Sequence, residues 1–282
     1  MRNTLLYLAA LSFSALAQDA VKELDTPYVP TPQAVVDRML ELAQVKSGET
    51  VVDLGSGDGR IMIEAARKYG ARGFGVEIDP RLVQRSKEAA ARAGVAGRVR
   101  FLQQDLFKTD FHEANVLTLY LLPDVNLALR PKILAELKPG SRVVSHDYAM
   151  GDWLPDAHET VPAPDKTVGA RKESQVYLWT VPARMEGEWA LAVRSEGKTR
   201  FMRLSLEQRY QILSGSIGIA GGKSLRLPEA KMHGDELRLV LPASVVGEEE
   251  VVLTGRVAAG SASGTARTPR GTESAWSAKR RS

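Results

Sequence analysis

The 282-residue sequence predicts an α/β domain with a doubly wound parallel sheet, followed by a small all-β barrel or sandwich. From residue 50 to residue 180, short apolar runs alternate with helical patterns, as in parallel sheets covered on both faces. After Pro182 the segments are short, alternate in polarity and are separated by glycine turns, which is typical of all-β domains. We expect a signal peptide at 1–17 and domains at 18–182 and 183–282.

The first residues have the layout of a secretory signal peptide. Arg2 precedes an apolar run from Leu5 to Leu16, and Ala15-Leu16-Ala17 is a small-x-small cleavage motif. The apolar run has about a dozen residues, whereas a spanning helix needs about 20. We expect cleavage after Ala17, export to the periplasm or envelope, and no integral membrane span in the mature chain. A cytoplasmic protein with an uncleaved N-terminal anchor is the alternative.

Composition and charge exclude several kinds of site and partner. The chain has no cysteine, which excludes disulfide scaffolds, iron–sulfur clusters and cysteine nucleophiles. Its four histidines lack the spacings of metal-binding motifs, so no metal site is expected. The net charge is +4, and residues 181–282 hold 16 basic against 11 acidic residues. This small excess, without basic runs interleaved with aromatics, predicts no nucleic-acid partner.

The first domain is expected to contain seven strands with helices between them. The strands are predicted at 50–54, 73–78, 98–102, 115–120, 142–146, 159–161 and 175–181, and helices at 60–69, 80–93 and 124–137. The last two strands have no long helix between them, which predicts a closing antiparallel hairpin at one edge of the sheet.

The second domain is expected to consist of short strands. They are predicted at 189–193, 200–206, 210–219, 224–227, 236–241, 251–257 and 274–278. Residues 258–272 are rich in Gly, Ser, Ala and Thr, which predicts either a loose hairpin or a mobile loop. Residues 279–282 are expected to form a flexible tail.

The most informative motif joins the first strand to the first of these helices. The run Asp53-Leu54-Gly55-Ser56-Gly57-Asp58-Gly59 places three glycines in a turn, where a ligand can approach the backbone closely. The following helix adds free N–H groups at its N-terminus. Arg60 stands where a dinucleotide-binding loop has its last glycine, and the two carboxylates would repel a pyrophosphate. S-Adenosylmethionine fits better, because it carries an ammonium and a sulfonium and no phosphate.

Two further carboxylates follow the next two strands. Glu77 ends the second strand, where an acidic side chain can accept hydrogen bonds from both ribose hydroxyls. Asp105 follows the third strand, beside Leu106, and can accept the adenine amino group. Together with the glycine turn, these positions predict S-adenosylmethionine as the cofactor. A generic α/β turn with solvated carboxylates and an NAD site are the alternatives.

These residues carry a resemblance to a known family. Residues 28 to about 181 resemble class I S-adenosylmethionine-dependent methyltransferases, which have a Rossmann-like, seven-stranded methyltransferase sheet. The chain is further similar to the lysine methyltransferases of the mitochondrial ATP-synthase c subunit and adenine nucleotide translocase, and to their bacterial relatives. The matching stretches are Tyr28–Pro32, Asp53–Arg60, Gly75–Pro80, Lys132–Val144 and Trp153–Pro155. The resemblance implies a protein-lysine N-methyltransferase.

The reacting groups are expected at the carboxyl ends of the strands. Tyr120 ends the fourth strand, which in this class borders the transferred methyl group, and is expected to orient the nucleophile. His146 and Asp147 end the fifth strand on opposite faces, and Asp147 is favoured because a carboxylate suits a cationic amine. Tyr28 and Thr31 are expected to close over the cofactor. The predicted cofactor-binding residues are Tyr28, Thr31, Asp53, Gly55, Ser56, Gly57, Gly59, Glu77, Asp105 and Leu106.

Three functions remain open at this point. The first is methylation of a lysine in a protein, with a membrane-associated protein among the expected substrates. The second is methylation of a small molecule, with the β domain helping to bind it. The third is an exported binding protein that keeps the fold without turnover.

Overall fold

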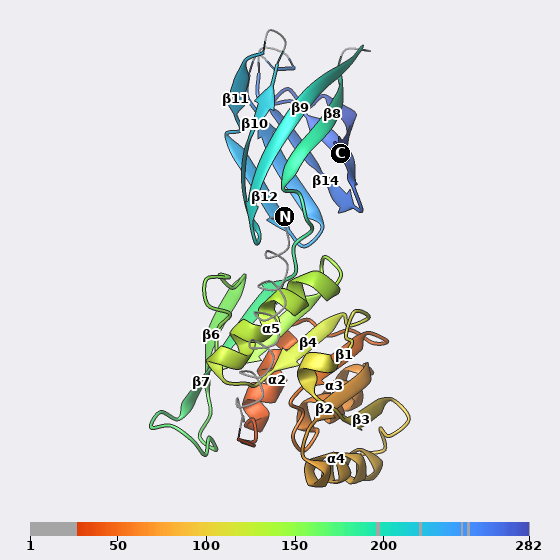
Figure 1. The fold of residues 1–282 in the computed structure, drawn as a ribbon, viewed down its shortest axis with the longest axis vertical. Coiled ribbons are helices and arrows are strands. Elements are labelled where there is room, and N and C mark those ends of the chain that lie inside the picture. Colours follow the sequence, from red (N-terminus) through yellow and green to blue (C-terminus); the bar gives the residue numbers. More distant parts are fainter. Residues whose placement is uncertain (1–26, 196–197, 220–221, 244, 247–248, 282) are drawn as a thin grey trace, which may run out of the picture. The chain divides into compact units, whose positions relative to one another are not determined.

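The computed structural model describes residues 27–195, 198–219, 222–243, 245–246 and 249–281, and these form two compact units (Figure 1). One unit contains the described residues through Leu137 together with Arg142–Trp179, and the other contains Lys138–Ser141 and the described residues from Thr180 onward. The predicted signal peptide, residues 1–17, lies outside the described residues, so cleavage and export stay predictions. Within the described residues, no helix has the length and apolar character needed to cross a membrane.

The first unit is built on a seven-stranded sheet with the order β3-β2-β1-β4-β5-β7-β6. Its strands are β1 (Thr50–Leu54), β2 (Arg72–Glu77), β3 (Val99–Gln103), β4 (Val116–Leu119), β5 (Arg142–His146), β6 (Ala157–Pro162) and β7 (Glu173–Thr180). The pairings among β1 to β5 are parallel, whereas β6 and β7 pair antiparallel. This confirms the predicted doubly wound sheet with a closing hairpin. The strand order reverses between β1 and β4, so that a crevice forms at their carboxyl ends.

The helices of this unit begin and end at residues with clear local reasons. They are α2 (Gln33–Leu42), α3 (Arg60–Tyr69), α4 (Pro80–Arg92) and α5 (Pro123–Glu136), with a short 3₁₀ helix, η2 (Leu106–Lys108). Prolines occupy the first position of α4 and α5, where a missing N–H costs nothing. Left-handed glycines stand at both ends of α3. The chain therefore turns sharply from β1 into α3, directly at the crevice.

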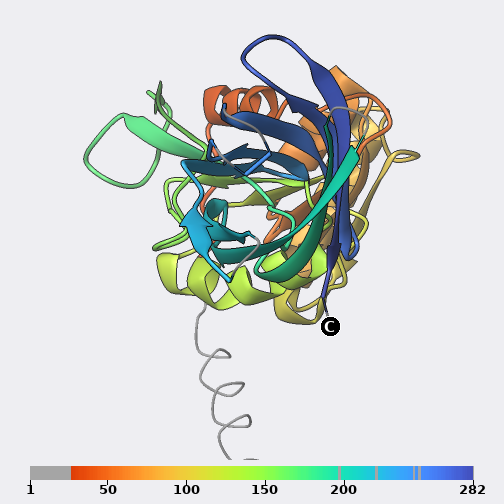
Figure 2. The ribbon, with the colours of Figure 1, turned by 90° about the horizontal axis from the view of Figure 1, so that it is seen from above.

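The second unit is a closed up-and-down barrel. Its strands are β8 (Gly187–Ser195), β9 (Lys198–Arg209), β10 (Ile212–Gly218), β11 (Ser224–Arg226), β12 (Glu229–His233), β13 (Glu236–Leu241), β14 (Val251–Ala258), β15 (Ser261–Arg267) and β16 (Glu273–Arg280), coloured green to blue in Figure 2. Apart from β11 and β12, consecutive strands pair antiparallel, and β16 pairs with β8 to close the ring. Both β11 and β12 pair with β10, so the barrel is eight strands around. Of the predicted alternatives, barrel and sandwich, the barrel is correct.

Side chains fill the interior of the barrel. Trp189 and Trp276 are buried there among aliphatic residues from every part of the ring. An eight-stranded barrel is just wide enough inside for side chains to fill it. Closure also removes the free sheet edges that would otherwise pair with other chains.

The glycine-rich stretch 258–272 contains a regular strand, so the mobile-loop alternative was wrong. β15 pairs along its whole length with β14 and β16. Gly255, Gly264 and Trp276 lie side by side across these three strands, and a Cβ on Gly255 would approach the indole Cζ2 to 2.7 Å. The indole Nε1 donates a hydrogen bond to the Thr254 carbonyl at 3.0 Å. Small residues therefore make room for a tryptophan.

The predicted flexible tail was also wrong for residues 279–281. Lys279 and Arg280 belong to β16, where Arg280 pairs with Trp189 of β8. The Arg281 N–H donates to the Glu188 carbonyl at 2.9 Å. The pairing of β16 with β8 that closes the barrel therefore includes Lys279 and Arg280, although their charge suggested a solvated C-terminal tail. The sequence likewise did not predict β12, because Glu229, Lys231 and His233 interrupt its apolar pattern.

We expect Gly255→Ala to lower the free energy of unfolding of the barrel by about 1–3 kcal/mol, because the added methyl group collides with the Ser263 carbonyl oxygen and, at 2.7 Å, with the Trp276 ring. Amide hydrogen exchange of β14 to β16, followed by mass spectrometry, measures this loss of protection. Ala258→Val adds volume at an exposed end of the same strand and is the matched control. Equal protection in the Gly255 variant and the wild type would contradict the assigned packing.

Candidate active site

A cavity of about 1090 Å³ lies in the first unit, at the crevice where the strand order reverses. Most of the residues predicted from the sequence line it. These are Tyr28, Thr31, Asp53, Gly55, Ser56, Gly57, Glu77, Asp105, Leu106 and Tyr120. Two predicted residues, Gly59 and Asp147, do not line the cavity. The residues brought together come from the N-terminal arm, four strand ends and the glycine turn.

The glycine turn between β1 and α3 depends on three residues with positive φ. Gly55, Gly57 and Gly59 have φ values of 76°, 53° and 81°, a region that side chains with a Cβ rarely adopt. A Cβ on Gly57 would lie 2.6 Å from Cε2 of Tyr28, so the ring of the arm rests on the turn. A Cβ on Gly59 would strike Phe101 and Ser86 instead. Gly59 therefore serves the packing of α3 rather than the cavity surface.

Asp53 is a buried carboxylate at the end of β1. Its Oδ1 accepts a hydrogen bond of 2.6 Å from the Thr118 hydroxyl on the neighbouring β4. Burial raises the pKa of Asp53 to about 7, against the effect of this hydrogen bond, and the charges of Glu77 and Asp58 raise it further. A cationic group placed beside Asp53 would favour its ionised form.

Backbone N–H groups hold the other two predicted carboxylates in place. Glu77 Oε2 accepts from the Gly57 N–H at 3.0 Å, and Oε1 accepts from the Ile78 N–H at 2.8 Å. Asp105 Oδ1 accepts from the Phe107 N–H at 2.9 Å and caps η2. Each carboxylate is thus fixed where its strand ends, at the cavity wall.

The lining of the cavity suits S-adenosylmethionine. The cavity is lined by five carboxylates and only two basic side chains, which favours a ligand with a positive charge. The carboxylates are Asp53, Asp58, Glu77, Asp79 and Asp105, and the basic residues are Arg60 and Lys108. Ile78, which the sequence analysis missed, is 67% exposed although it is a large apolar residue. With Leu82 and Leu106 it offers an apolar surface for an adenine ring. The position directly after Glu77 was the only signal that could have indicated Ile78.

Arg60 ties the N-terminal arm to the glycine turn. Its guanidinium donates to both oxygens of Asp58, at 2.9 and 2.7 Å. It also donates to the Thr31 carbonyl at 2.7 Å. In the sequence, Arg60 was notable only because it stands where a dinucleotide-binding loop has its last glycine. The structure shows that it holds residues 27–31 over the cavity, where Tyr28 and Thr31 were expected to close.

Tyr120, which lines the cavity, packs against His146 in a tilted ring pair. Their ring centroids are 3.8 Å apart. His146 is fully buried, with Nδ1 3.3 Å from the Thr31 hydroxyl and Nε2 2.9 Å from the Ser174 hydroxyl. Burial lowers the pKa of His146 to about 4, so the ring is neutral near pH 7. Burial, with the charge of Asp147, raises the pKa of Tyr120 to about 12, so its phenol stays protonated.

Asp147 is occupied elsewhere, which corrects the preference for it as a catalytic group. Its Oδ2 lies 2.7 Å from Nζ of Lys166, and its Oδ1 accepts from the Gln175 N–H at 2.9 Å. Its backbone has φ of 61°, and its N–H donates to the Gln175 carbonyl. Asp147 therefore joins the end of β5 to the hairpin. Sequence reasoning missed this because both partners lie far along the chain.

The chain is similar to known proteins. The family model described as "ANTKMT methyltransferase domain" matches residues 53–157. Over 130 residues, the chain is 45% identical to a protein-lysine N-methyltransferase of Saccharolobus islandicus, and the match covers 46% of this chain and 81% of that relative. The chain belongs to this methyltransferase family. S-Adenosylmethionine is therefore its cofactor, and methyl transfer is its reaction.

Two further relatives of this methyltransferase carry different names. Over 151 residues it is 36% identical to the Xenopus laevis lysine N-methyltransferase named for the ATP synthase c subunit, covering 54% of this chain and 65% of that enzyme. It is 53% identical to an RNA methyltransferase from Salinibacter ruber, solved in complex with S-adenosyl-L-homocysteine. That match covers 56% of this chain and 96% of the other, with a TM-score of 0.50.

We expect the affinity for S-adenosylmethionine to fall as the pH drops below about 7, by up to about tenfold per pH unit. The cationic ligand favours ionised Asp53, and its binding must remove the proton that Asp53 holds below its pKa of about 7. Calorimetric titrations between about pH 5.5 and about pH 8 measure the dissociation constant. Asp53→Asn should bind more weakly and lose this dependence. A flat profile in the wild type would refute the role of Asp53.

Proposed function

We propose that this methyltransferase acts on the ε-amino group of lysine in a protein. The observation that carries this proposal is the 45% identity to a protein-lysine N-methyltransferase, over 81% of that relative's length. The acidic lining of the cavity supports it, because lysine approaches as a cation. We further propose a membrane-associated protein as the acceptor, in line with the predicted export and with the substrate named for the Xenopus relative.

Some residues of the chain would bind the cofactor, and others would orient the acceptor. Asp53, Glu77 and Asp105 would hold the cofactor, with Gly55, Ser56 and Gly57 allowing close approach and Tyr28, Thr31 and Leu106 covering it. When bound, S-adenosylmethionine supplies a methyl group on a sulfonium, a centre with a good leaving group. Catalysis would then rest mainly on the orientation of the acceptor.

Tyr120 is the proposed orienting group. Its phenol stays protonated, so it would position the amine by hydrogen bonding rather than remove a proton. His146 would keep the Tyr120 ring in place, because both nitrogens of His146 already contact hydroxyl groups. With no free base in this pair, the amine would lose its proton to water. The rate would therefore rise with pH toward the lysine pKa of about 10.4.

RNA methylation is the second candidate, because a relative with 53% identity is an RNA methyltransferase. The five carboxylates of the cavity argue against it, since they would repel a phosphate backbone at the reacting centre. A small-molecule acceptor, the other possibility left by the sequence, has no specific observation in its favour.

Transfer of a labelled methyl group decides between these acceptors. The chain from Gln18 onward is incubated with methyl-labelled S-adenosylmethionine and with membrane, soluble-protein and RNA fractions. We expect label in a protein band, and acid hydrolysis should yield methyllysine. Label that is lost after ribonuclease treatment, or found only in small molecules, would refute the proposal.

The matched inactive control is Gly57→Val. Its Cβ would strike the Tyr28 ring at a position whose positive φ strains any side chain. We expect no transfer and no measurable cofactor binding. Circular dichroism checks that the fold is retained.

We expect Tyr120→Ala to lower kcat by about 100-fold while changing cofactor affinity less than about threefold, because orientation is lost. Tyr120→Phe keeps the ring on His146 and isolates the contribution of the hydroxyl. Steady-state kinetics with calorimetric binding separate the two effects. Tyr177→Phe, outside the cavity, is the control. Wild-type kcat in Tyr120→Ala would remove Tyr120 from the mechanism.

A further inference from the structure

One end of the barrel gathers basic side chains that methyl transfer does not use. Because the strands run up and down, the β8–β9 and β10–β11 turns lie at the same end, opposite to Gly187, where the chain enters β8 (Figure 1). The two hairpins are neighbours, since β9 pairs with β10 from Arg203 to Arg209.

Five exposed cations on these two hairpins have no acidic partner among the described residues. We call them the basic patch: Arg194, Lys198, Arg200, Lys223 and Arg226. Several other arginines of the barrel are paired with acids instead. Arg256 contacts Asp235 and Glu236 at 2.8 Å, and Arg270 contacts Glu249 at 2.9 Å. The basic patch can therefore bind anions without breaking an ion pair.

Phe201 stands out among these cations as an exposed aromatic residue. It is 80% exposed on β9, opposite Ala192 of β8. The next even-numbered residues of β9, such as Leu204, face the core, so Phe201 points outward from the barrel wall. Its partner across the strands, Ala192, has a small side chain, so the ring stays exposed.

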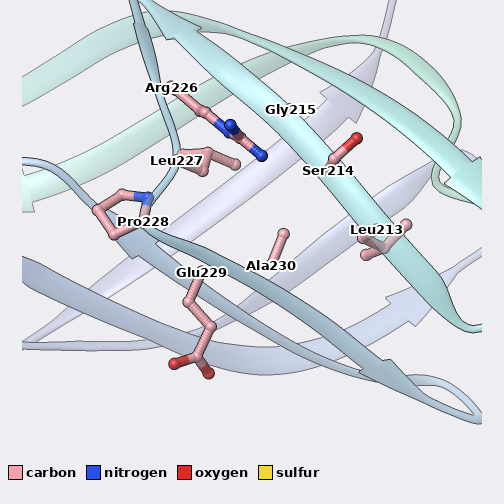
Figure 3. A pocket seen from close by; sticks show the side chains of 8 residues that line it. All are labelled: Leu213, Ser214, Gly215, Arg226, Leu227, Pro228, Glu229 and Ala230. Carbon is pink, nitrogen blue, oxygen red and sulfur yellow. The ribbon is translucent and has the colours of Figure 1, made fainter.

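The strand break after Arg226 keeps that cation free. Pro228 interrupts the strand between β11 and β12 and leaves a hollow of about 310 Å³ against β10. The acidic residue of this hollow, Glu229, is taken by Arg238 at 2.8 Å and Lys231 at 3.3 Å. In Figure 3 its carboxylate and the Arg226 guanidinium lie at opposite ends of the hollow.

We propose that the basic patch and Phe201 form a docking surface for membranes that contain anionic lipids. Unpaired cations are attracted to an anionic headgroup layer, and an exposed aromatic ring inserts at its boundary with the acyl chains. Single-stranded nucleic acid fits less well, because it stacks on several aromatics along a groove. The barrel's tryptophans, Trp189 and Trp276, are buried. This docking is separate from methyl transfer and does not depend on which acceptor is used.

Vesicle co-sedimentation tests the proposal. The chain from Gln18 onward, which keeps every described residue, is mixed with vesicles of phosphatidylcholine alone or with about 30% phosphatidylglycerol. We expect binding only to the anionic vesicles, weakening as salt is added. Phe201→Ser should lower the partition coefficient about tenfold or more. The triple variant Arg194→Gln, Lys198→Gln, Arg200→Gln should remove most of the binding and its salt dependence.

Two variants at other positions serve as matched controls. Ile212→Ser removes the barrel's other exposed large apolar residue, 54% exposed at the far end of β10, and Lys279→Gln removes a cation on β16. Both should bind anionic vesicles like the parent chain. Amide hydrogen exchange of β8 to β16 shows that the barrel of each variant is folded. Equal binding to neutral vesicles, no binding to either kind, or no effect of the patch variants would overturn the proposal. Phe201-dependent binding of single-stranded RNA without vesicle binding would assign the surface to nucleic acid instead.

Discussion

Three left-handed glycines at the end of β1 determine how the active site is assembled. Each one allows a close contact that a Cβ would prevent: Gly55 with Leu121, Gly57 with Tyr28, and Gly59 with Phe101. These partners come from the segment after β4, from the N-terminal arm and from β3. One short turn therefore brings three distant parts of the chain together. The same turn points the N-terminus of α3 at the crevice, so the packing constraint and the binding surface have a common origin.

The electrostatics of the site follow from this geometry. Asp53 is buried because the turn and β4 cover it, and burial raises its pKa to about 7. Glu77 and Asp105 remain at the cavity wall because backbone N–H groups hold them there. Behind the wall, Thr31, His146 and Ser174 form a buried chain of contacts that links the arm, β5 and β7. These three side chains are uncharged, so their contacts can fix the position of Tyr120 without taking part in proton transfer.

The barrel depends on a different constraint, which is how its sheet closes and how its interior is filled. It closes by pairing β16 with β8, and small residues on β14 and β15 leave room for the Trp276 ring. Its interior is filled with side chains, so any binding function belongs on the outside. There, arginines such as Arg256 and Arg270 are paired with acids, whereas the cations of the basic patch have no acidic partner among the described residues. The proposed docking surface and the methyl-transfer site therefore belong to different units of the chain.

The sequence by itself determined the features that depend on neighbouring residues. The glycine turn, the acidic strand ends at Glu77 and Asp105, and the alternation of strands and helices are local patterns, and they sufficed for the sheet and the cofactor. Only the tertiary structure decided how long-range partners use the remaining groups. Asp147 was expected in the site but is held by Lys166, and His146 is enclosed by Thr31 and Ser174. The glycine-rich stretch became β15 because Trp276 packs there, and Phe201 remained exposed because its face of β9 turns outward. For Asp147, His146 and Trp276 the deciding contact joins residues that are separated in the chain, which no local pattern specifies.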